Sequence, residues 1–447
     1  MGLEAGIVYG AATGTTDGGF GGWNAQISDV ILAANGTLND TMLNAFGYNA
    51  IHEMTVLGKE LSKKFYNSSD LYSYYQGCSE GGREGWSQVQ RYGAQFDGAA
   101  IGAPAFRQAF QQVNHLFSGL VEVTHDYYPS ACELERITND TIAKCDALDG
   151  KVDGVVSRTD LCKLHYDPKN SIGKSYSCPA TRPGTVASNG TVTAKAAAIA
   201  SDIWKGLYDS KGRQVYVSYQ PSADFTDAQT TYNSATGKYE YTASGIAVSY
   251  INLFLKQIDS NTLPLANVTY DTLREWMLEG ALKFSSTLQT NWPDLEVFHN
   301  SGGKVIHFHG ESDPSVPSDS SVIYHDAVRQ IMYPNKTFDE SYDSLHDWYR
   351  LFLIPGAAHC SINPEQPNGP FPHNVLESVI DWVENGINPT ELNATVSGGT
   401  SSEADQKICS FPLRPLWKNN HTMECVHDKK SIDTWLPKLD SIPIPVY

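Results

Sequence analysis

The first hundred residues alternate between short apolar runs and segments in which apolar residues recur with helical spacing. Buried strands are predicted at 4–12, 71–75 and 96–104. Helical spacing predicts one helix over 40–66 and a second one through Trp86, Val89 and Tyr92. Strands that alternate with helices indicate a parallel sheet covered on both faces. The predicted fold class is therefore α/β.

This pattern is lost after about residue 107 and returns near residue 300. The stretch between contains four cysteines, a Ser-, Thr-, Gly- and Pro-rich run at 167–195, and amphipathic helices near 196–207 and 244–258. Further along, the pattern predicts strands at 304–309 and 348–354, a helix at 375–384 and then an irregular tail. We expect residues 1–106 and 301–447 to form one core and residues 107–300 to form an inserted cap.

A nucleophile elbow is the clearest motif. Residues Gly77-Cys78-Ser79-Glu80-Gly81 match G-x-S-x-G between a predicted strand and a predicted helix, which is the context that the motif requires. Glycines at the flanking positions leave room for the exposed hydroxyl and for close backbone approach. The N–H groups at the start of the helix favour developing negative charge. The alternative is a glycine-rich turn without chemistry.

An acid and a base follow the serine in the order that such a fold demands. Asp313 comes shortly after the strand at 304–309, and His359 comes shortly after the strand at 348–354. Asp319 and Asp326 are rival acids that lie further from the strand end. The alternatives are a turn residue before proline for Asp313 and a loop histidine for His359. As a triad, His359 would accept the Ser79 proton and Asp313 would orient the imidazole.

Two cysteines adjoin the predicted catalytic residues. Cys78 precedes Ser79 and Cys360 follows His359. If Ser79 and His359 are within hydrogen-bond reach, their neighbours fall within the ~4.4–6.8 Å Cα separation of a disulfide. We therefore predict a Cys78–Cys360 bridge, with two buried free thiols as the alternative.

Composition indicates the cellular compartment of the protein and excludes some classes of partner. A net charge of −18 argues against nucleic acid, and no apolar run approaches the ~20 residues of a membrane span. Eight cysteines and a high density of glycosylation sequons predict a secreted glycoprotein with disulfides, against scattered free thiols. The opening, residues 1–6, has no signal-peptide pattern. The nine sequon asparagines are Asn35, Asn39, Asn67, Asn139, Asn189, Asn267, Asn335, Asn393 and Asn420.

Three segments resemble the tannase and feruloyl esterase family. They are Gly-Cys-Ser-Glu-Gly-Gly-Arg-Glu-Gly at 77–85, Phe-Asp-Gly-Ala-Ala-Ile-Gly-Ala-Pro at 96–104 and Pro-Gly-Ala-Ala-His-Cys at 355–360. The resemblance implies an α/β-hydrolase with a large inserted lid that hydrolyses esters of phenolic acids. We expect first a feruloyl esterase acting on hydroxycinnamate esters of plant cell-wall polysaccharides such as xylan. A tannase is the second expectation, and a non-catalytic binding protein on the same fold is the third.

The predicted cap contains an acidic loop at 146–155 that is a candidate Ca²⁺ site. Asp146, Asp149 and Asp153 lie close together in the sequence, beside turn glycines, which suits Ca²⁺ or a plain Asp-Gly turn. The resemblance favours a structural Ca²⁺ held by these three carboxylates and by the carbonyls of Lys151 and Val155. Cys145–Cys162 and Cys409–Cys425 are expected as local disulfides, which leaves Cys132 to pair with Cys178.

An oxyanion hole needs two donors. The backbone N–H of Glu80 is expected to be one of them, and the other normally comes from a glycine-rich loop far upstream. Because we expect the sequence to begin inside the sheet, the second donor has no assignment. Loss of one donor would cost about 10²–10³ in rate.

Overall fold

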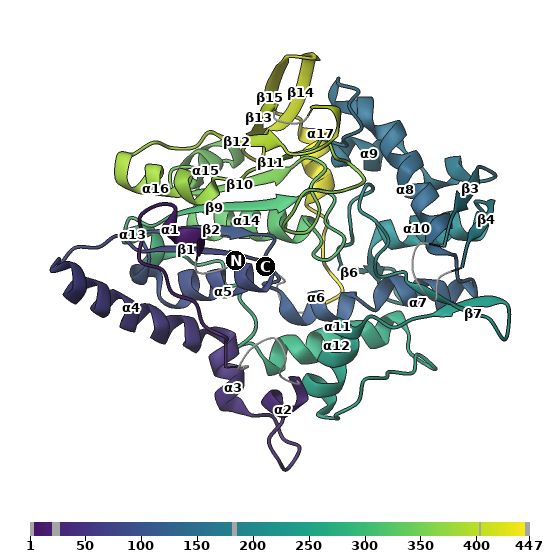
Figure 1. Cartoon of the computed structure of the whole chain (residues 1–447), viewed down its shortest axis with the longest axis horizontal. Coiled ribbons are helices and arrows are strands. Elements are labelled where there is room, and N and C mark those ends of the chain that lie inside the picture. Colours follow the sequence, from purple (N-terminus) through teal and green to yellow (C-terminus); the bar gives the residue numbers. More distant parts are fainter. Residues whose placement is uncertain (1–3, 20–26, 181–185, 402–403, 443–447) are drawn as a thin grey trace.

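The computed structural model describes residues 4–19, 27–180, 186–401 and 404–442. At its centre lies a sheet of four parallel strands in the order β1 (Tyr74–Cys78), β2 (Gly98–Gly102), β9 (Lys304–Gly310) and β10 (Tyr349–Ile354). Figure 1 shows this sheet among helices that come from both ends of the sequence. The α/β class and its parallel sheet are confirmed.

Helices and a small sheet cover the two faces of the central sheet. One face packs on α5 (Glu80–Arg91) and α14 (Asp319–Met332) through a core that includes Trp86 and Tyr324. The other face packs on α16 (Val375–Asn385) and on β12 (Glu391–Val396). Successive residues of β2 serve the two cores in turn, since Ala99 belongs to the first and Ala100 to the second. This alternation is the period of two expected of a strand.

The strand predicted at 71–75 lies three residues later, at β1. Pairing with β2 begins only where Tyr74 lies opposite Gly98. The N–H of Ser73 is instead bound by the Asp97 carboxylate, at 2.7 Å. A side chain therefore ends the ladder just before β1 begins.

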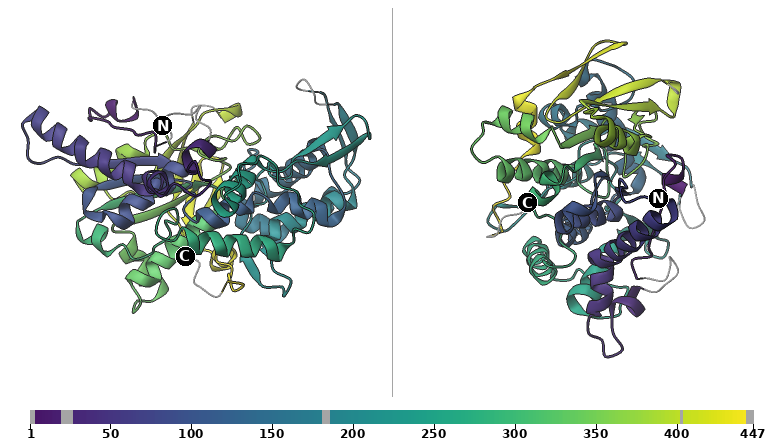
Figure 2. Two further views of the ribbon diagram at one scale, coloured as in Figure 1. Left: turned by 90° about the horizontal axis from the view of Figure 1, so that it is seen from below. Right: turned by 90° about the vertical axis from the view of Figure 1, so that its left-hand side faces the viewer.

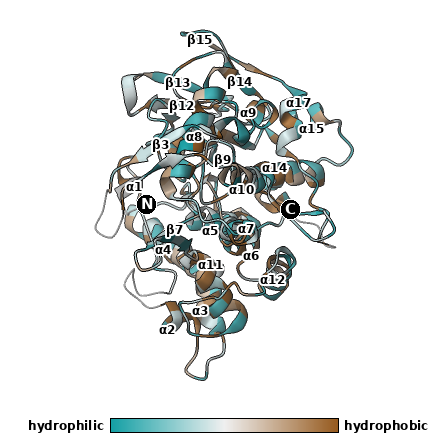
Figure 3. Ribbon diagram, turned by 90° about the vertical axis from the view of Figure 1, so that its right-hand side faces the viewer, coloured by the Kyte–Doolittle hydropathy of each residue, from teal (hydrophilic) through white to brown (hydrophobic). Residues whose placement is uncertain are grey.

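The segment between β2 and β9 forms a second, mainly helical part with its own core. In Figure 2 it extends beside the sheet, and in Figure 3 several of its helices carry both hydrophobic and hydrophilic stretches, as amphipathic helices do. Its buried residues, among them Phe110, Ile199 and Met277, form one cluster. Ile31 and Leu43 from the N-terminal helices belong to the same cluster. Residues before β1 therefore pack on this part as well as on the sheet.

The elements of this second part follow one another closely. Its helices are α6 (Gln108–Asn114), α7 (Phe117–His125), α8 (Ala131–Cys145), α9 (Thr159–His165), α10 (Ala194–Lys205), α11 (Gly245–Ser249) and α12 (Tyr270–Lys283). Its hairpins pair β3 (Ser175–Cys178) with β4 (Ser188–Thr191), β5 (Leu207–Tyr208) with β6 (Gln214–Tyr216), and β7 (Thr230–Asn233) with β8 (Lys238–Tyr241).

The prediction of a buried strand at 4–12 is wrong. Residues Glu4–Ile7 form a helical turn, α1, and the side chains of Ile7 and Val8 are 63% and 79% exposed. A run this short cannot distinguish strand from helix by periodicity. The helix predicted over 40–66 is confirmed as α3 (Asp40–Asn44), a π-helical segment (Ala45–Asn49) and α4 (Ala50–Tyr66), with α2 (Ile27–Ile31) before them.

The tail is not irregular. Strand β12 pairs with β11 (Pro370–Phe371) and with β13 (Asp405–Cys409), and β14 (Arg414–Asn419) forms a hairpin with β15 (Thr422–Val426). The sequence carries the signal, because apolar Leu392, Ala394 and Val396 alternate with polar Glu391 and Asn393, and the structure buries the apolar set and exposes the polar pair. The remaining helices are α13 (Glu296–Asn300), α15 (Phe338–Leu345) and α17 (Lys429–Ile432). Among the described helices, none is long and apolar enough to cross a bilayer.

Candidate active site

Ser79 lies at the tip of a sharp turn between β1 and α5. Its φ of 65° and ψ of −121° lie in a region that residues other than glycine rarely adopt. Its N–H donates to the carbonyl of Gly102 at 3.0 Å, and its own carbonyl accepts the N–H groups of Arg83 and Ala105. The neighbouring strand and the first turn of α5 therefore hold the strained serine in place.

The two glycines of the elbow differ in how tightly they are packed. A Cβ at Gly77 would lie 2.4 Å from the carbonyl oxygen of Gly81. A Cβ at Gly81 would meet only the hydroxyl of Tyr75, at 3.9 Å. Close approach therefore requires the first glycine but not the second, contrary to the expectation for both.

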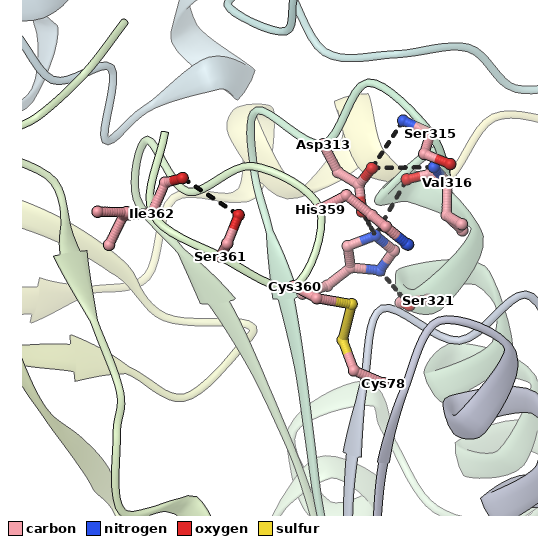
Figure 4. The surroundings of a disulfide bond; sticks show 10 residues. Cys78, Asp313, Ser315, Val316, Ser321, His359, Cys360, Ser361 and Ile362 are labelled. Carbon is pink, nitrogen blue, oxygen red and sulfur yellow. Dashed lines mark hydrogen bonds and ion pairs between the residues drawn. A yellow bond between two sulfur atoms is a disulfide. The ribbon is translucent and has the colours of Figure 1, made fainter. Parts of the chain in front are cut away.

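Asp313 lies in the loop after β9, and its side chain is buried. Its Oδ1 accepts the N–H groups of Ser315 at 2.8 Å and of Val316 at 2.9 Å. Its Oδ2 lies 2.7 Å from Nδ1 of His359 (Figure 4). The rival acids make other contacts: Asp319 pairs with Lys163, and Asp326 pairs with Arg329.

His359 occupies a tight turn after β10. The N–H of Ala358 donates to the carbonyl of Ser361 at 3.0 Å, which places His359 and Cys360 at the centre of the turn. The imidazole is 23% exposed on its side chain, so it is not enclosed like its partner carboxylate. Gly310 lets this turn approach β9, because a Cβ there would lie 2.4 Å from the carbonyl oxygen of Ala358.

A disulfide joins the serine turn to the histidine turn. Cys78 and Cys360 are bonded, with their Cα atoms 6.1 Å apart, which confirms the predicted bridge (Figure 4). It connects the residue before Ser79 with the residue after His359 across a sequence separation of 282. The bridge therefore holds two distant segments, and the predicted nucleophile and base with them, at one end of the sheet.

The other three predicted disulfides are also present. The bonded pairs are Cys132–Cys178, Cys145–Cys162 and Cys409–Cys425. The structure thus contains four disulfides and no free cysteine among the residues it describes.

The aspartate and histidine shift each other's ionisation. Burial acts to raise the pKa of Asp313, but the charge of His359 and hydrogen bonds from His309 and His359 outweigh it and hold that pKa well below its ordinary value. Burial acts to lower the pKa of His359, but the Asp313 carboxylate outweighs it and raises that pKa above 6.5. Asp313 is therefore an anion at neutral pH, and His359 is a stronger base than a free histidine.

Helix α5 begins at Glu80, directly after the serine. The first N–H groups of a helix have no acceptor within it, so the backbone N–H of Glu80 is placed as an oxyanion donor should be. The Glu80 carboxylate pairs with Arg83 at 2.5 Å. Arg83 is fully buried and donates to the carbonyls of Phe46 and Gly47. The π-helical segment is thereby tied to the serine turn.

The predicted calcium loop lies between α8 and α9. Oδ1 of Asp146 accepts the N–H of Asp153, and Oδ1 of Asp149 accepts the N–H of Lys151. Lys151 Nζ also pairs with Asp153 at 2.9 Å. Among the described residues, no three His, Cys, Asp or Glu side chains are grouped as metal ligands. The Ca²⁺ site therefore stays a prediction.

One carboxylate of this loop nevertheless has the character of a cation ligand. Oδ2 of Asp149 is buried and has no hydrogen-bond partner among the described residues. Burial raises the pKa of Asp149 to about 6, and the charges of Asp153 and Asp146 add to this rise. A bound cation would supply the missing partner and relieve the repulsion.

Sequence reasoning missed a second histidine beside Asp313. His309 is fully buried on β9, and its Nε2 lies 3.1 Å from Oδ2 of Asp313. The available signal was the alternation of His307 and His309 along the strand, which places both on one face of the sheet.

Comparisons with known proteins identify the family. The model of the family described as tannase and feruloyl esterase matches residues 2–432. A tannase of Aspergillus oryzae is 48% identical over 99% of this chain and 80% of its own length. A probable feruloyl esterase of Arthroderma benhamiae is 30% identical over 95% of this chain and 74% of its own length.

Solved structures give the same result. A tannin acyl hydrolase from Aspergillus niger has a TM-score of 0.97 and 54% identity over 100% of this chain and 81% of its own. Feruloyl esterase B from Aspergillus oryzae has a TM-score of 0.69 and 26% identity over 87% of this chain and 76% of its own. The resemblance seen in the sequence is confirmed, and the chain belongs to the tannase and feruloyl esterase family.

Proposed function

We propose that this protein is a serine ester hydrolase that cleaves esters of phenolic acids through Ser79, His359 and Asp313. The observation that carries the proposal is the Cys78–Cys360 disulfide, which joins the serine turn to a histidine already bonded to a buried carboxylate at 2.7 Å. The strained φ of Ser79 and its place before α5 support the role of nucleophile.

In the proposed reaction, Oγ of Ser79 attacks the ester carbonyl carbon while Nε2 of His359 takes the hydroxyl proton. The N–H of Glu80 stabilises the resulting oxyanion, and the second donor is unassigned. Collapse of the tetrahedral intermediate expels the alcohol, which receives the proton from His359. Water then attacks the acyl-enzyme with His359 as base again, and release of the acid restores Ser79.

Galloyl esters are the proposed substrate class, ahead of feruloyl esters. Identity is 48% to the tannase and 54% to the tannin acyl hydrolase, but 30% to the probable feruloyl esterase and 26% to feruloyl esterase B. Of the two sequence expectations, we therefore prefer the second. Feruloyl esters remain the alternative substrates of the same site.

The finer features of the protein are proposals as well. The fold would be an α/β-hydrolase in which the part at 107–300 acts as a lid. Asp146, Asp149 and Asp153, with the carbonyls of Lys151 and Val155, would hold a Ca²⁺ that stiffens this part and does not act on the ester. The four disulfides support an extracellular location, as does the exposure of eight of the nine sequon asparagines.

Hydrolysis of methyl gallate and methyl ferulate tests the proposal, with Ser79→Ala as control. We expect a higher kcat/KM on the gallate ester and loss of several orders of magnitude in the variant. A preference for ferulate would return the substrate class to the first expectation. Folded protein that hydrolyses neither ester would favour the non-catalytic binding protein.

A further inference from the structure

His309 contacts the carboxylate that orients the proposed base. Its Nε2 lies 3.1 Å from Oδ2 of Asp313 and 3.0 Å from the carbonyl oxygen of Val316. Both partners are acceptors, so Nε2 carries a hydrogen and donates it. Its Nδ1 lies 2.7 Å from Oγ of Ser321 on α14, whose hydroxyl can donate to it. The sheet, the acid loop and α14 therefore fix this ring (Figure 4 shows Ser321 and Asp313).

In the described part of the chain, four donors surround the Asp313 carboxylate, two on each oxygen. Oδ1 is held by the backbone of its own loop, at Ser315 and Val316. Oδ2 is shared by two imidazoles, those of His359 and His309. The backbone contacts fix one oxygen only. The second oxygen, which bonds the proposed base, has His309 as its other hydrogen-bond donor.

We propose that His309 is a positioning residue, which holds Oδ2 of Asp313 in place and through it the ring of His359. The inference rests on the proposed function, because it concerns the same triad. His309 is buried behind the carboxylate and has no contact with Ser79 among the hydrogen bonds of the described residues. It acts through Asp313, because both His309 and His359 bond Oδ2 of that carboxylate.

The titratable groups around His309 determine which charge is affected when His309 is replaced. The titratable groups around it are Asp313, His359, His307 and Asp319. Burial holds the pKa of His307 well below its ordinary value, so this neighbour is neutral. Asp319 pairs with Lys163 at 2.9 Å. The Asp313 carboxylate is therefore the anion that His309 bonds directly.

His309→Leu removes the donor and tests the proposal. We expect kcat on methyl gallate to fall about 10- to 100-fold with little change in KM, because the base loses its fixed position. In the pH profile of kcat/KM, the rise on the acid side (the acid limb) reports the ionisation of His359. This acid limb should move to higher pH. Without the donor from His309, less of the negative charge of Asp313 is compensated, so the carboxylate raises the pKa of His359 further. His309→Gln, which keeps an N–H at similar reach, should restore most of both properties.

His307→Leu is the matched control. His307 lies on the same strand, is equally buried, and bonds the hydroxyl of Tyr349 at 2.9 Å and not Asp313. We expect this variant to lower Tm and to leave the acid limb in place. An unchanged kcat and acid limb in folded His309→Leu would overturn the proposal. The same displacement of the limb in both leucine variants would also overturn it.

A second variant keeps the test decisive if His309→Leu does not fold. Ser321→Ala leaves the histidine in place and removes the partner of its Nδ1. It should move the acid limb in the same direction by a smaller amount, and an unchanged limb and kcat would reject the role of His309.

The rate at which a fluorophosphonate labels Ser79, followed against pH, separates failure of the inference from failure of the proposed function. A folded wild-type protein that is not labelled would defeat the proposed function. A labelled wild type whose rate and pH dependence match those of His309→Leu would defeat the positioning role alone.

Discussion

At the scale of single residues, some glycines near the serine turn have room for a larger side chain and others do not. Two glycines of α5 illustrate this, since both lie in the same helix beside the ring of Tyr75. A Cβ at Gly85 would lie 2.5 Å from Cε1 of Tyr75 and 3.2 Å from Cδ1 of Ile101. The ring cannot move away freely, because its hydroxyl donates to the carbonyl of Gly81 at 2.6 Å.

We predict that Gly85→Ala destabilises the protein by about 1–3 kcal/mol, the usual cost of overpacking. Gly81→Ala is the matched control, because its added methyl makes only an ordinary contact with the hydroxyl of Tyr75, at 3.9 Å, and alanine suits a helix better than glycine. Urea unfolding of both variants checks this expectation. Equal stability of the two variants would show that Tyr75 yields without cost.

The sequence predicted which residues carry the chemistry better than it predicted the contacts around them. Asp313 was chosen over Asp319 and Asp326 from its distance to a strand end, and the structure places it on His359. All four cysteine pairs were also foreseen. His309 was missed because its contact with Asp313 depends on how the loop after β9 folds back, which periodicity does not encode.

At the scale of elements, the acidic loop lies against both loops of the proposed triad. The N–H of Val156 donates to Gln366, whose amide in turn donates to Ser312 at 2.7 Å, next to Asp313. On the other side, a Cβ at Gly356 would lie 2.8 Å from Cγ1 of Val155. A cation that orders the acidic loop would therefore stiffen the loops that carry Asp313 and His359.

We predict that Ca²⁺ raises Tm and that a chelator reverses the gain. At free Ca²⁺ roughly 100-fold above its Kd, the stabilisation should be about 2.7 kcal/mol. Without the ion, the raised pKa of Asp149 means that stability falls as pH rises from the ordinary value of 3.8 to about 6. Asp149→Asn should therefore be at least as stable as the wild type in chelator at neutral pH, yet gain nothing from Ca²⁺.

Asp224→Asn is the control for this experiment, because Asp224 closes a similar turn through the N–H of Thr226 but is exposed. It should keep the full response to Ca²⁺. A wild-type Tm that does not change with Ca²⁺ would contradict the calcium proposal.

The elements themselves were foreseen where both periodicity and length were favourable. Strands β2, β9 and β10 and helix α16 lie at their predicted places. The segment at 4–12 was misassigned because its apolar run is too short to define a period, and Ile7 and Val8 are exposed. The tail strands were missed, although Leu392, Ala394 and Val396 of β12 alternate with polar residues.

At the scale of the whole molecule, the proposed site depends on segments from both ends of the sequence. The sheet brings β1, β9 and β10 together, and one disulfide spans a separation of 282 residues to join two of their loops. The helical part has a separate core and also packs against the N-terminal helices. The sequence patterns did not indicate that residues such as Ile31 and Leu43 would pack on the helical part.

The most direct test of the central claim is where an activated serine probe reacts. Wild-type protein and His359→Ala would be treated with a fluorophosphonate, and the modified peptide identified by mass spectrometry. We predict one label per chain, on Ser79, in the wild type and almost none in the variant, because the serine is then no longer activated. A label on another residue, or equal labelling of both proteins, would contradict the assignment of Ser79 and His359 as nucleophile and base.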